Sequence, residues 1–179
     1  MTVLAAVLLA NADGRAGALL AVRRDSKAII FCFFAAFLAL AAVSAVGAVL
    51  ASNMLGLGVL NLFAALALGS AAAALLWPRR APVAGDQLAG LPAPLLFIRL
   101  LLIQFGDRNQ FLIFALGALS GAALWGTVGG IVGLSVALLP VLALGPGVLE
   151  LKGARIARWT AAGLLILWVM LRLRRAFGV

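Results

Sequence analysis

Long runs of apolar residues separated by short polar stretches set the pattern of this chain. Several of the runs exceed the roughly 18 residues with which a helix crosses a bilayer. The pattern predicts six membrane-spanning helices, at Thr2–Val22, Lys27–Ser52, Leu55–Trp77, Ala93–Gly117, Leu119–Leu144 and Ile156–Leu173. The expected fold class is therefore an all-α polytopic membrane protein.

The longest polar and proline-bearing stretch divides these helices into two groups of three. Residues 78–92 are predicted to form a central cytoplasmic loop, between a first three-helix repeat at 1–77 and a second at 93–179. Because three spans is an odd number, the two halves should lie upside down relative to each other. Such inverted repeats are common in secondary transporters, whose sites lie near the middle of the membrane where the repeats meet.

Composition agrees with this class. Of the 179 residues, 66% are hydrophobic and 11% are charged, and the mean hydropathy of +1.23 is far above that of soluble domains. The net charge of +9 does not indicate nucleic acid, because most of the basic residues lie in short connections: Arg23, Arg24, Lys27, Arg79, Arg80, Lys152, Arg155 and Arg158. Placing these connections inside the cell predicts N- and C-termini outside.

Several kinds of chemistry are missing from the sequence. The chain has no histidine and a single cysteine, Cys32, which excludes imidazole ligands and a disulfide within the chain. It also lacks a CxxC pair and a phosphate-binding glycine motif, so we expect neither enzymatic activity nor a bound cofactor. No Lys or Arg precedes the first apolar run, so we expect residues 1–22 to be retained as a helix rather than cleaved as a signal peptide.

Two polar heptads interrupt the first span of each half. NADGRAG (residues 11–17) and QFGDRNQ (104–110) align without a gap: each begins with a carboxamide, carries Gly and Asp at the third and fourth places in exchanged order, and has Arg fifth. Asp107 follows Pro94 by thirteen residues, about 20 Å of helix rise, which is near the middle of a membrane. On a continuous helix Gln104, Asp107 and Arg108 would share one face.

These heptads can supply ligands for a cation. Unwinding of the backbone at Gly14 and Gly106 would allow four oxygen-bearing side chains to meet, those of Asp13, Asp107, Asn11 and Gln104. Oxygen ligands with two negative charges suit a hard divalent ion such as Ca²⁺, Mg²⁺ or Mn²⁺. Intramembrane carboxyl groups also carry protons in pumps and transporters, so exchange of a metal for protons is a natural hypothesis.

Two other interpretations use the same residues. Asp13 and Asp107 could pair with Arg15 and Arg108, within or between the copies, and serve only to hold helices together. Alternatively, the two arginines could hold an anionic group of a small exported solute. Separately, the small-xxx-small glycine pairs of the fifth span are expected to allow close helix packing, at Gly117/Gly121, Gly126/Gly130 and Gly129/Gly133.

The second heptad resembles the signature of a known family. Residues 104–109, Q-F-G-D-R-N, resemble the motif E-x-G-D-[KR]-[ST] of the GDT family of Mn²⁺/Ca²⁺–proton exchangers, which includes transmembrane protein 165 and bacterial manganese exporters. The match lies at Gly106, Asp107 and Arg108. The resemblance implies six spans in two inverted halves, antiport of Mn²⁺ or Ca²⁺ against protons, and the bacterial inner membrane. The implied partners are the bilayer, the cation and protons, and a homodimer is compatible with the sequence.

The chain departs from this family at the positions of its acids. The motif glutamate is replaced by Gln104 in the second copy and by Asn11 in the first, where Gly-Asp has also become Asp13-Gly14 and Lys-Thr has become Arg15-Ala16. We therefore expect a transporter whose metal ligands are Asp107, Asp13, Gln104 and Asn11, with Arg108 and Arg15 as charge partners. The alternative is a degenerate, non-transporting scaffold or partner subunit held by Asp–Arg pairs.

Overall fold

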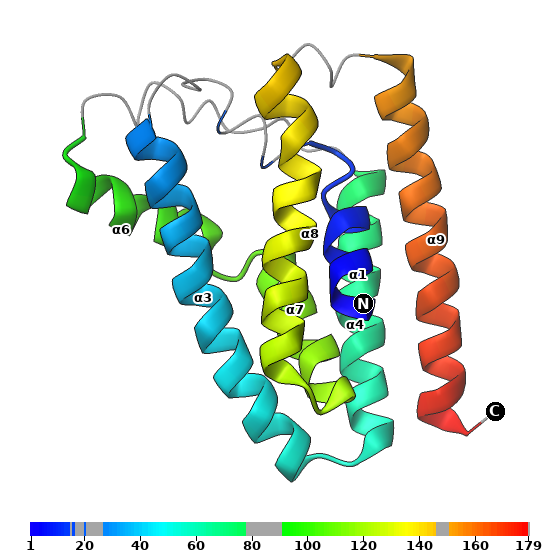
Figure 1. The fold of residues 1–179 in the computed structure, drawn as a ribbon. Coiled ribbons are helices and arrows are strands. Elements are labelled where there is room, and N and C mark those ends of the chain that lie inside the picture. Colours follow the sequence, from blue (N-terminus) through cyan, green and yellow to red (C-terminus); the bar gives the residue numbers. More distant parts are fainter. Residues whose placement is uncertain (15, 17–19, 21–26, 78–90, 146–150, 179) are drawn as a thin grey trace.

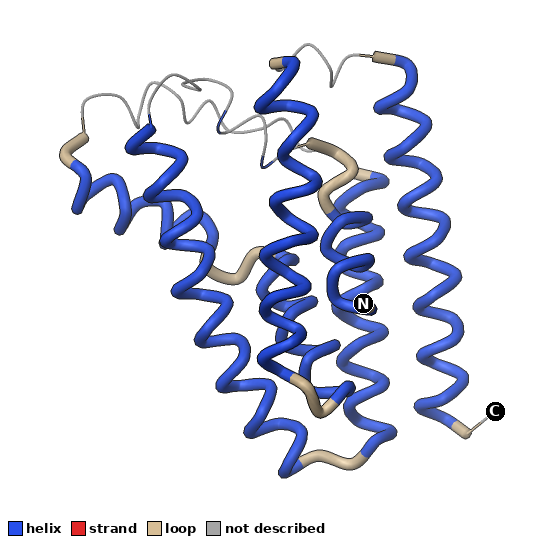
Figure 2. Tube along the Cα trace, viewed as in Figure 1, coloured by secondary structure: helices blue, strands red, loops and turns tan. Residues whose placement is uncertain are grey.

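The described part of the chain is entirely helical (Figure 1, Figure 2). The computed structural model describes all residues except 15, 17–19, 21–26, 78–90, 146–150 and 179. Within these limits it contains no strand and has seven helices: α1 (Thr2–Ala10), α3 (Lys27–Met54), α4 (Leu57–Leu76), α6 (Ala93–Gln104), α7 (Arg108–Ser120), α8 (Ala123–Leu144) and α9 (Lys152–Phe177). Nearly all of the predicted central loop lies outside the described residues.

Four of these helices are long and apolar enough to cross a membrane. They are α3, α4, α8 and α9, with 28, 20, 22 and 26 residues. At about 1.5 Å of rise per residue, even the shortest spans about 30 Å, the thickness of a bilayer's hydrocarbon core. Their lengths and composition are those of membrane-spanning helices and agree with four of the six predicted spans.

The surface is also that expected of a protein in lipid. Large apolar side chains are widely exposed, among them Phe31, Leu66, Leu124 and Trp125. So many exposed large apolar side chains are unusual in soluble monomers and are typical of surfaces that contact lipid or another protein. The protein interior, in contrast, is built largely from alanine and leucine side chains.

The predicted span at Ala93–Gly117 consists of two helices instead of one. α6 ends at Gln104 and α7 begins at Arg108, so neither is long enough alone to cross the membrane. Figure 2 shows the loop between them. The predicted first span is also interrupted, since α1 ends at Ala10. The breaks coincide with the two polar heptads, where glycine and polar side chains favour turns over continued helix.

α1 is the short helix at the centre of the assembly. It contacts α4, α7, α8 and α9, and Ala6, Val7 and Ala10 are fully buried. In Figure 1 the N-terminus lies at mid-height of the bundle, and the C-terminus lies at one end. α9 packs mainly against α4, while α3 packs against α6 and α7. This packing places the end of α1 beside the start of α7.

Glycines of α8 allow both α1 and α7 to pack closely against α8. A Cβ atom at Gly133 would lie 2.7 Å from the backbone oxygen of Leu4, and one at Gly130 would lie 2.5 Å from the Ile113 side chain. A Cβ atom at Gly129 would also crowd the backbone of Leu4. The expected close packing is thus present along this helix. Gly121 is different, because it ends α7 with φ +64° and has open space around it.

Gly133→Ala is expected to destabilise the protein. The added methyl group meets the backbone of α1, which cannot move as a side chain can, so the free energy of unfolding should fall by about 1–3 kcal/mol. The matched control is Gly163→Ala in α9, where a Cβ atom meets nothing within 4 Å. Unfolding in mixed detergent micelles measures both. Equal stability of the two variants would contradict this account of the packing.

Candidate functional site

The second heptad forms a turn that interrupts the helix. Phe105 has φ −63° and ψ 127°, Gly106 has φ +72°, and the backbone N–H of Asp107 donates to the Gln104 carbonyl at 3.1 Å. These are the features of a type II turn, whose third residue needs a positive φ. A Cβ atom at Gly106 would meet nothing within 4 Å. Glycine is therefore required here by the backbone conformation and not by space.

The first heptad also forms a turn. Asn11 ends α1 with φ −97° and ψ 11°, and its carbonyl accepts a hydrogen bond from the Gly14 N–H at 2.9 Å. Gly14 has φ +65°, a conformation that L side chains rarely adopt. The expected unwinding at Gly14 and Gly106 is thus present in both copies.

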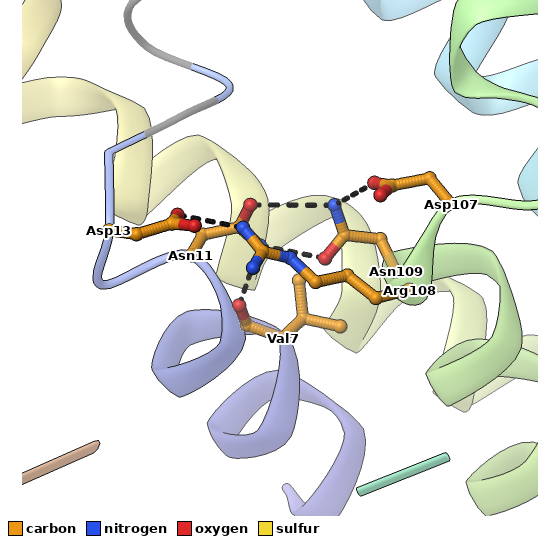
Figure 3. Close-up of polar contacts among 6 residues, drawn as sticks. All are labelled: Val7, Asn11, Asp13, Asp107, Arg108 and Asn109. Atoms are coloured by element: carbon orange, nitrogen blue, oxygen red, sulfur yellow. Dashed lines mark hydrogen bonds and ion pairs between the residues drawn. The ribbon is translucent and has the colours of Figure 1, made fainter. Parts of the chain in front are cut away.

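A reciprocal pair of amides joins the two heptads (Figure 3). Asn11 Nδ2 donates to Asn109 Oδ1 at 2.7 Å, and Asn109 Nδ2 donates to Asn11 Oδ1 at 3.4 Å, between residues 98 apart in sequence. Asn11 Nδ2 also donates to the Val7 carbonyl at 2.7 Å. Both side chains are buried, with 4% and 3% of their surface exposed. Because unpaired amides are costly inside an apolar bundle, this pair fixes how the heptads meet.

An ion pair lies beside the amides. Arg108 Nη2 donates to Asp13 Oδ1 at 2.7 Å, with 9% of the Arg108 side chain and 13% of the Asp13 side chain exposed. Figure 3 shows the guanidinium of the second heptad directed toward the carboxylate of the first. The arginine thus pairs with the acid of the other copy, one of the pairings that the sequence left open. Arg15 lies outside the described residues.

Asp107 has a different environment from Asp13. One of its carboxylate oxygens accepts a hydrogen bond from Asn109 Nδ2 at 2.8 Å, and none of the ion pairs among the described residues includes it. It occupies the N-cap of α7, where the helix dipole favours negative charge. The cluster defined by Asn11, Asp13, Asp107, Arg108 and Asn109 therefore contains one acid paired with a cation and one held by an amide. We call it the heptad cluster.

Gln104, a predicted ligand, turns toward α3 instead of toward these residues. Its Nε2 donates to the Phe33 carbonyl at 3.2 Å, and its buried Oε1 has no hydrogen-bond partner among the described residues. Asn109, which we did not predict as a site residue, bonds to both Asn11 and Asp107. Its position in the polar heptad was visible in the sequence, but the first heptad has no amide at the matching place to single it out.

A cavity of about 380 Å³ borders the turn of the second heptad, at Phe105 and Gly106. Phe105, Gly106, Gln110, Phe111 and Ser44 are among its lining residues, and most of its wall is apolar. Ser44 Oγ donates to Gln110 Oε1 at 3.3 Å, while the buried Gln110 Nε2 has no partner among the described residues. Its lining residues come from α3, α7 and the turn between α6 and α7, and Asp107 is not one of them.

The chemistry available at the heptad cluster is that of oxygen ligands and charge. Two carboxylates and one guanidinium leave a formal charge of minus one, and the two amides add neutral oxygens. Within the described residues no group of three or more His, Cys, Asp or Glu side chains gathers as a preformed metal site. A cation bound here would draw on both heptads and on amide oxygens.

Gly106→Ala is expected to strain the turn. Because Gly106 has φ +72° and open space around it, the loss should come from the backbone alone and amount to about 1–2 kcal/mol of unfolding free energy. Gly153→Ala, at a position with equal space but no positive φ, is the control and should cost less. Unfolding in mixed micelles compares the two. A Gly106→Ala variant as stable as its control would contradict the turn assignment.

The amide pair should appear as a coupling energy between Asn11 and Asn109. Removing either side chain leaves polar atoms of the other without a partner, so the losses from Asn11→Ala and Asn109→Ala should not add. We expect a coupling of about 0.5–2 kcal/mol in a double-mutant cycle of unfolding. Thr160, whose hydroxyl bonds only to carbonyls of its own helix, is the control. Asn11→Ala and Thr160→Ala should be additive, and additivity of both cycles would refute the pairing.

The site has no counterpart among the proteins with which the chain was compared. No family model matches the sequence, and no curated protein or solved structure matches it either. Its function must therefore be inferred from the residues themselves.

Proposed function

We propose that this protein is a membrane transporter that exchanges a divalent cation, Mn²⁺ or Ca²⁺, for protons at the heptad cluster. The observation that carries the proposal is the meeting of two polar heptads, 98 residues apart at their amide pair, inside an otherwise apolar helical bundle. Ionisable residues within a membrane are costly and usually mark a transport pathway. The resemblance of residues 104–109 to the signature of the GDT exchangers supports the choice of ion.

The proposed architecture is six spans in two inverted repeats. In each half of the described chain a short helix ends just before a positive-φ glycine, α1 before Gly14 and α6 before Gly106, and two long apolar helices follow later in the half. Broken helices that meet near the middle of the membrane are the usual site of secondary transporters. The proposed location is the bacterial inner membrane, with both termini outside and the central loop in the cytoplasm.

Asp107 is the proposed principal carrier of the cation. Its carboxylate is held by a neutral amide, so it keeps its charge available for an incoming ion. Asp13 supplies the second carboxylate, and the amide oxygens of Asn11 and Asn109 lie in the same hydrogen-bonded group. Gln104 is left out of this ligand set, because its side chain turns toward Phe33 of α3.

Exchange follows from competition for the same oxygens. Divalent ions bind carboxylates in their deprotonated form, so protons and metal cannot occupy one carboxylate together. Protonation of Asp107 and Asp13 on one side of the membrane would release the ion, and loss of those protons would allow another to bind. The cavity beside Gly106 and Gln110 adjoins the turn that precedes Asp107, and it is the proposed place of access for the ion.

The second candidate function is a non-transporting scaffold or partner subunit. The observation in its favour is the Asp13–Arg108 ion pair, which neutralises one of the two acids and links the two halves of the chain. In that case the polar contacts would only specify how the helices assemble, as buried polar groups do in some proteins.

Transport by purified protein in vesicles tests the proposal. Mn²⁺ or Ca²⁺ uptake driven by a pH gradient should exceed that of empty vesicles, and Asp107→Asn should reduce it at least about tenfold because the main charged ligand is lost. The control is Glu150→Gln, which removes an acid outside both heptads and should leave uptake unchanged.

Two outcomes would refute transport: no uptake above empty vesicles, or full uptake by Asp107→Asn. The melting temperature of the protein, measured with and without Mn²⁺, then distinguishes a transporter from a scaffold. A ligand present at 100 times its dissociation constant stabilises a protein by about 2.7 kcal/mol, so Mn²⁺ should raise the melting temperature of a transporter. A scaffold would be destabilised by Asp107→Asn and indifferent to the metal.

A further inference from the structure

Arg108 occupies a position that is unfavourable for a structural cation. It is the first residue of α7, and the partial positive charge at a helix N-terminus repels a guanidinium. Its side chain is 9% exposed, so water does little to offset that repulsion. The residue is nevertheless held in the interior beside Asp13.

The contacts of Arg108 are also incomplete. Nη2 donates to Asp13 at 2.7 Å, but the buried Nη1 has no hydrogen-bond partner among the described residues. Strong arginine–carboxylate pairs use two parallel hydrogen bonds, and a pair with one bond holds the guanidinium less firmly. A buried cation with an unused donor contributes little to stability, which argues against Arg108 serving only to hold helices together.

We propose that Arg108 is a tethered cation, which occupies the carboxylate of Asp13 when no ion is bound and leaves it when the transported ion arrives. This inference rests on the proposed function. It assigns Arg108 a role in positioning charge and in release of the ion, and it starts from the observed contact of Arg108 with Asp13.

The charges of the heptad cluster explain why Arg108 and the ion would compete for the carboxylate of Asp13. With Arg108 in place, two carboxylates and one guanidinium give a formal charge of minus one. A divalent ion added beside the guanidinium would bring two cations together in a low-dielectric interior, where their repulsion is strong. When the ion takes the place of the guanidinium at Asp13, that repulsion is removed. Binding of the ion and pairing of Arg108 with Asp13 therefore exclude each other.

A tethered cation would make binding weaker and release easier. Each binding event must break the Asp13–Arg108 pair, and each release restores it. Removing the guanidinium should therefore tighten ion binding and slow exchange at the same time. A purely structural ion pair predicts the opposite for binding, because its loss would loosen the site.

The test is Mn²⁺ binding to the full chain in detergent, measured by calorimetry and by the shift in melting temperature. Arg108→Gln should bind Mn²⁺ more tightly, by about 5- to 150-fold, the range of common coupling between competing sites. Arg108→Lys, which keeps the charge, should bind nearly as weakly as the parent. Arg155→Gln is the matched control, because it removes the same charge from the exposed surface of α9 and should leave binding unchanged.

A second substitution at Arg108 separates an effect on Mn²⁺ binding from an effect on folding. Arg108→Met replaces the guanidinium by an apolar side chain of similar length, which is often tolerated where a buried charge was held. Tighter binding by either folded variant supports the tethered cation. Equal or weaker binding by the folded variants overturns it, and so does failure of both to fold, because the pair would then be needed for structure.

Vesicle uptake distinguishes this inference from the proposed function. If the parent transports Mn²⁺ or Ca²⁺ and Arg108→Gln binds no more tightly, only the tethered cation is refuted. If neither the parent nor Arg108→Gln binds or transports either ion, the proposed function fails and the inference fails with it.

Discussion

The reciprocal hydrogen bonds between Asn11 and Asn109 are the contact on which the site depends. In an apolar bundle an amide without partners is costly, so the two side chains must find each other across 98 residues of sequence. Their pairing places the end of α1 beside the start of α7. Asp13 lies two residues after Asn11, and Arg108 lies one residue before Asn109. The amide pair therefore brings these two charged side chains close enough to form their ion pair.

This contact needs a close approach that glycine provides. α1 is short and central, and the backbone around Leu4 lies against Gly129 and Gly133 of α8. Side chains at those positions would push α1 outward and carry Asn11 away from Asn109. The glycines of α8 therefore permit close helix packing. The positive-φ glycines Gly14 and Gly106 have another role, because they allow the chain to turn where the polar side chains meet.

The Asp13–Arg108 ion pair links the transporter and scaffold hypotheses. As a permanent contact it would hold the halves together, and as an exchangeable contact it would set the charge that an arriving ion must replace. Its single hydrogen bond and its place at a helix N-terminus favour exchange. Asp107 shows the contrast, since its negative charge at the same N-terminus is favoured and its partner is a neutral amide.

Apolar length and glycine within polar heptads are local properties, so the sequence was enough to predict the all-helical class, four long apolar helices and unwinding at Gly14 and Gly106. It also singled out Asn11, Asp13, Asp107 and Arg108. The packing of the helices selects the side-chain partners: Arg108 reaches the acid of the other heptad, Asn109 bonds to Asn11 and Asp107, and Gln104 turns to Phe33. Partner choice depends on how helices rotate and pack against one another, and residue spacing along one helix does not contain that information.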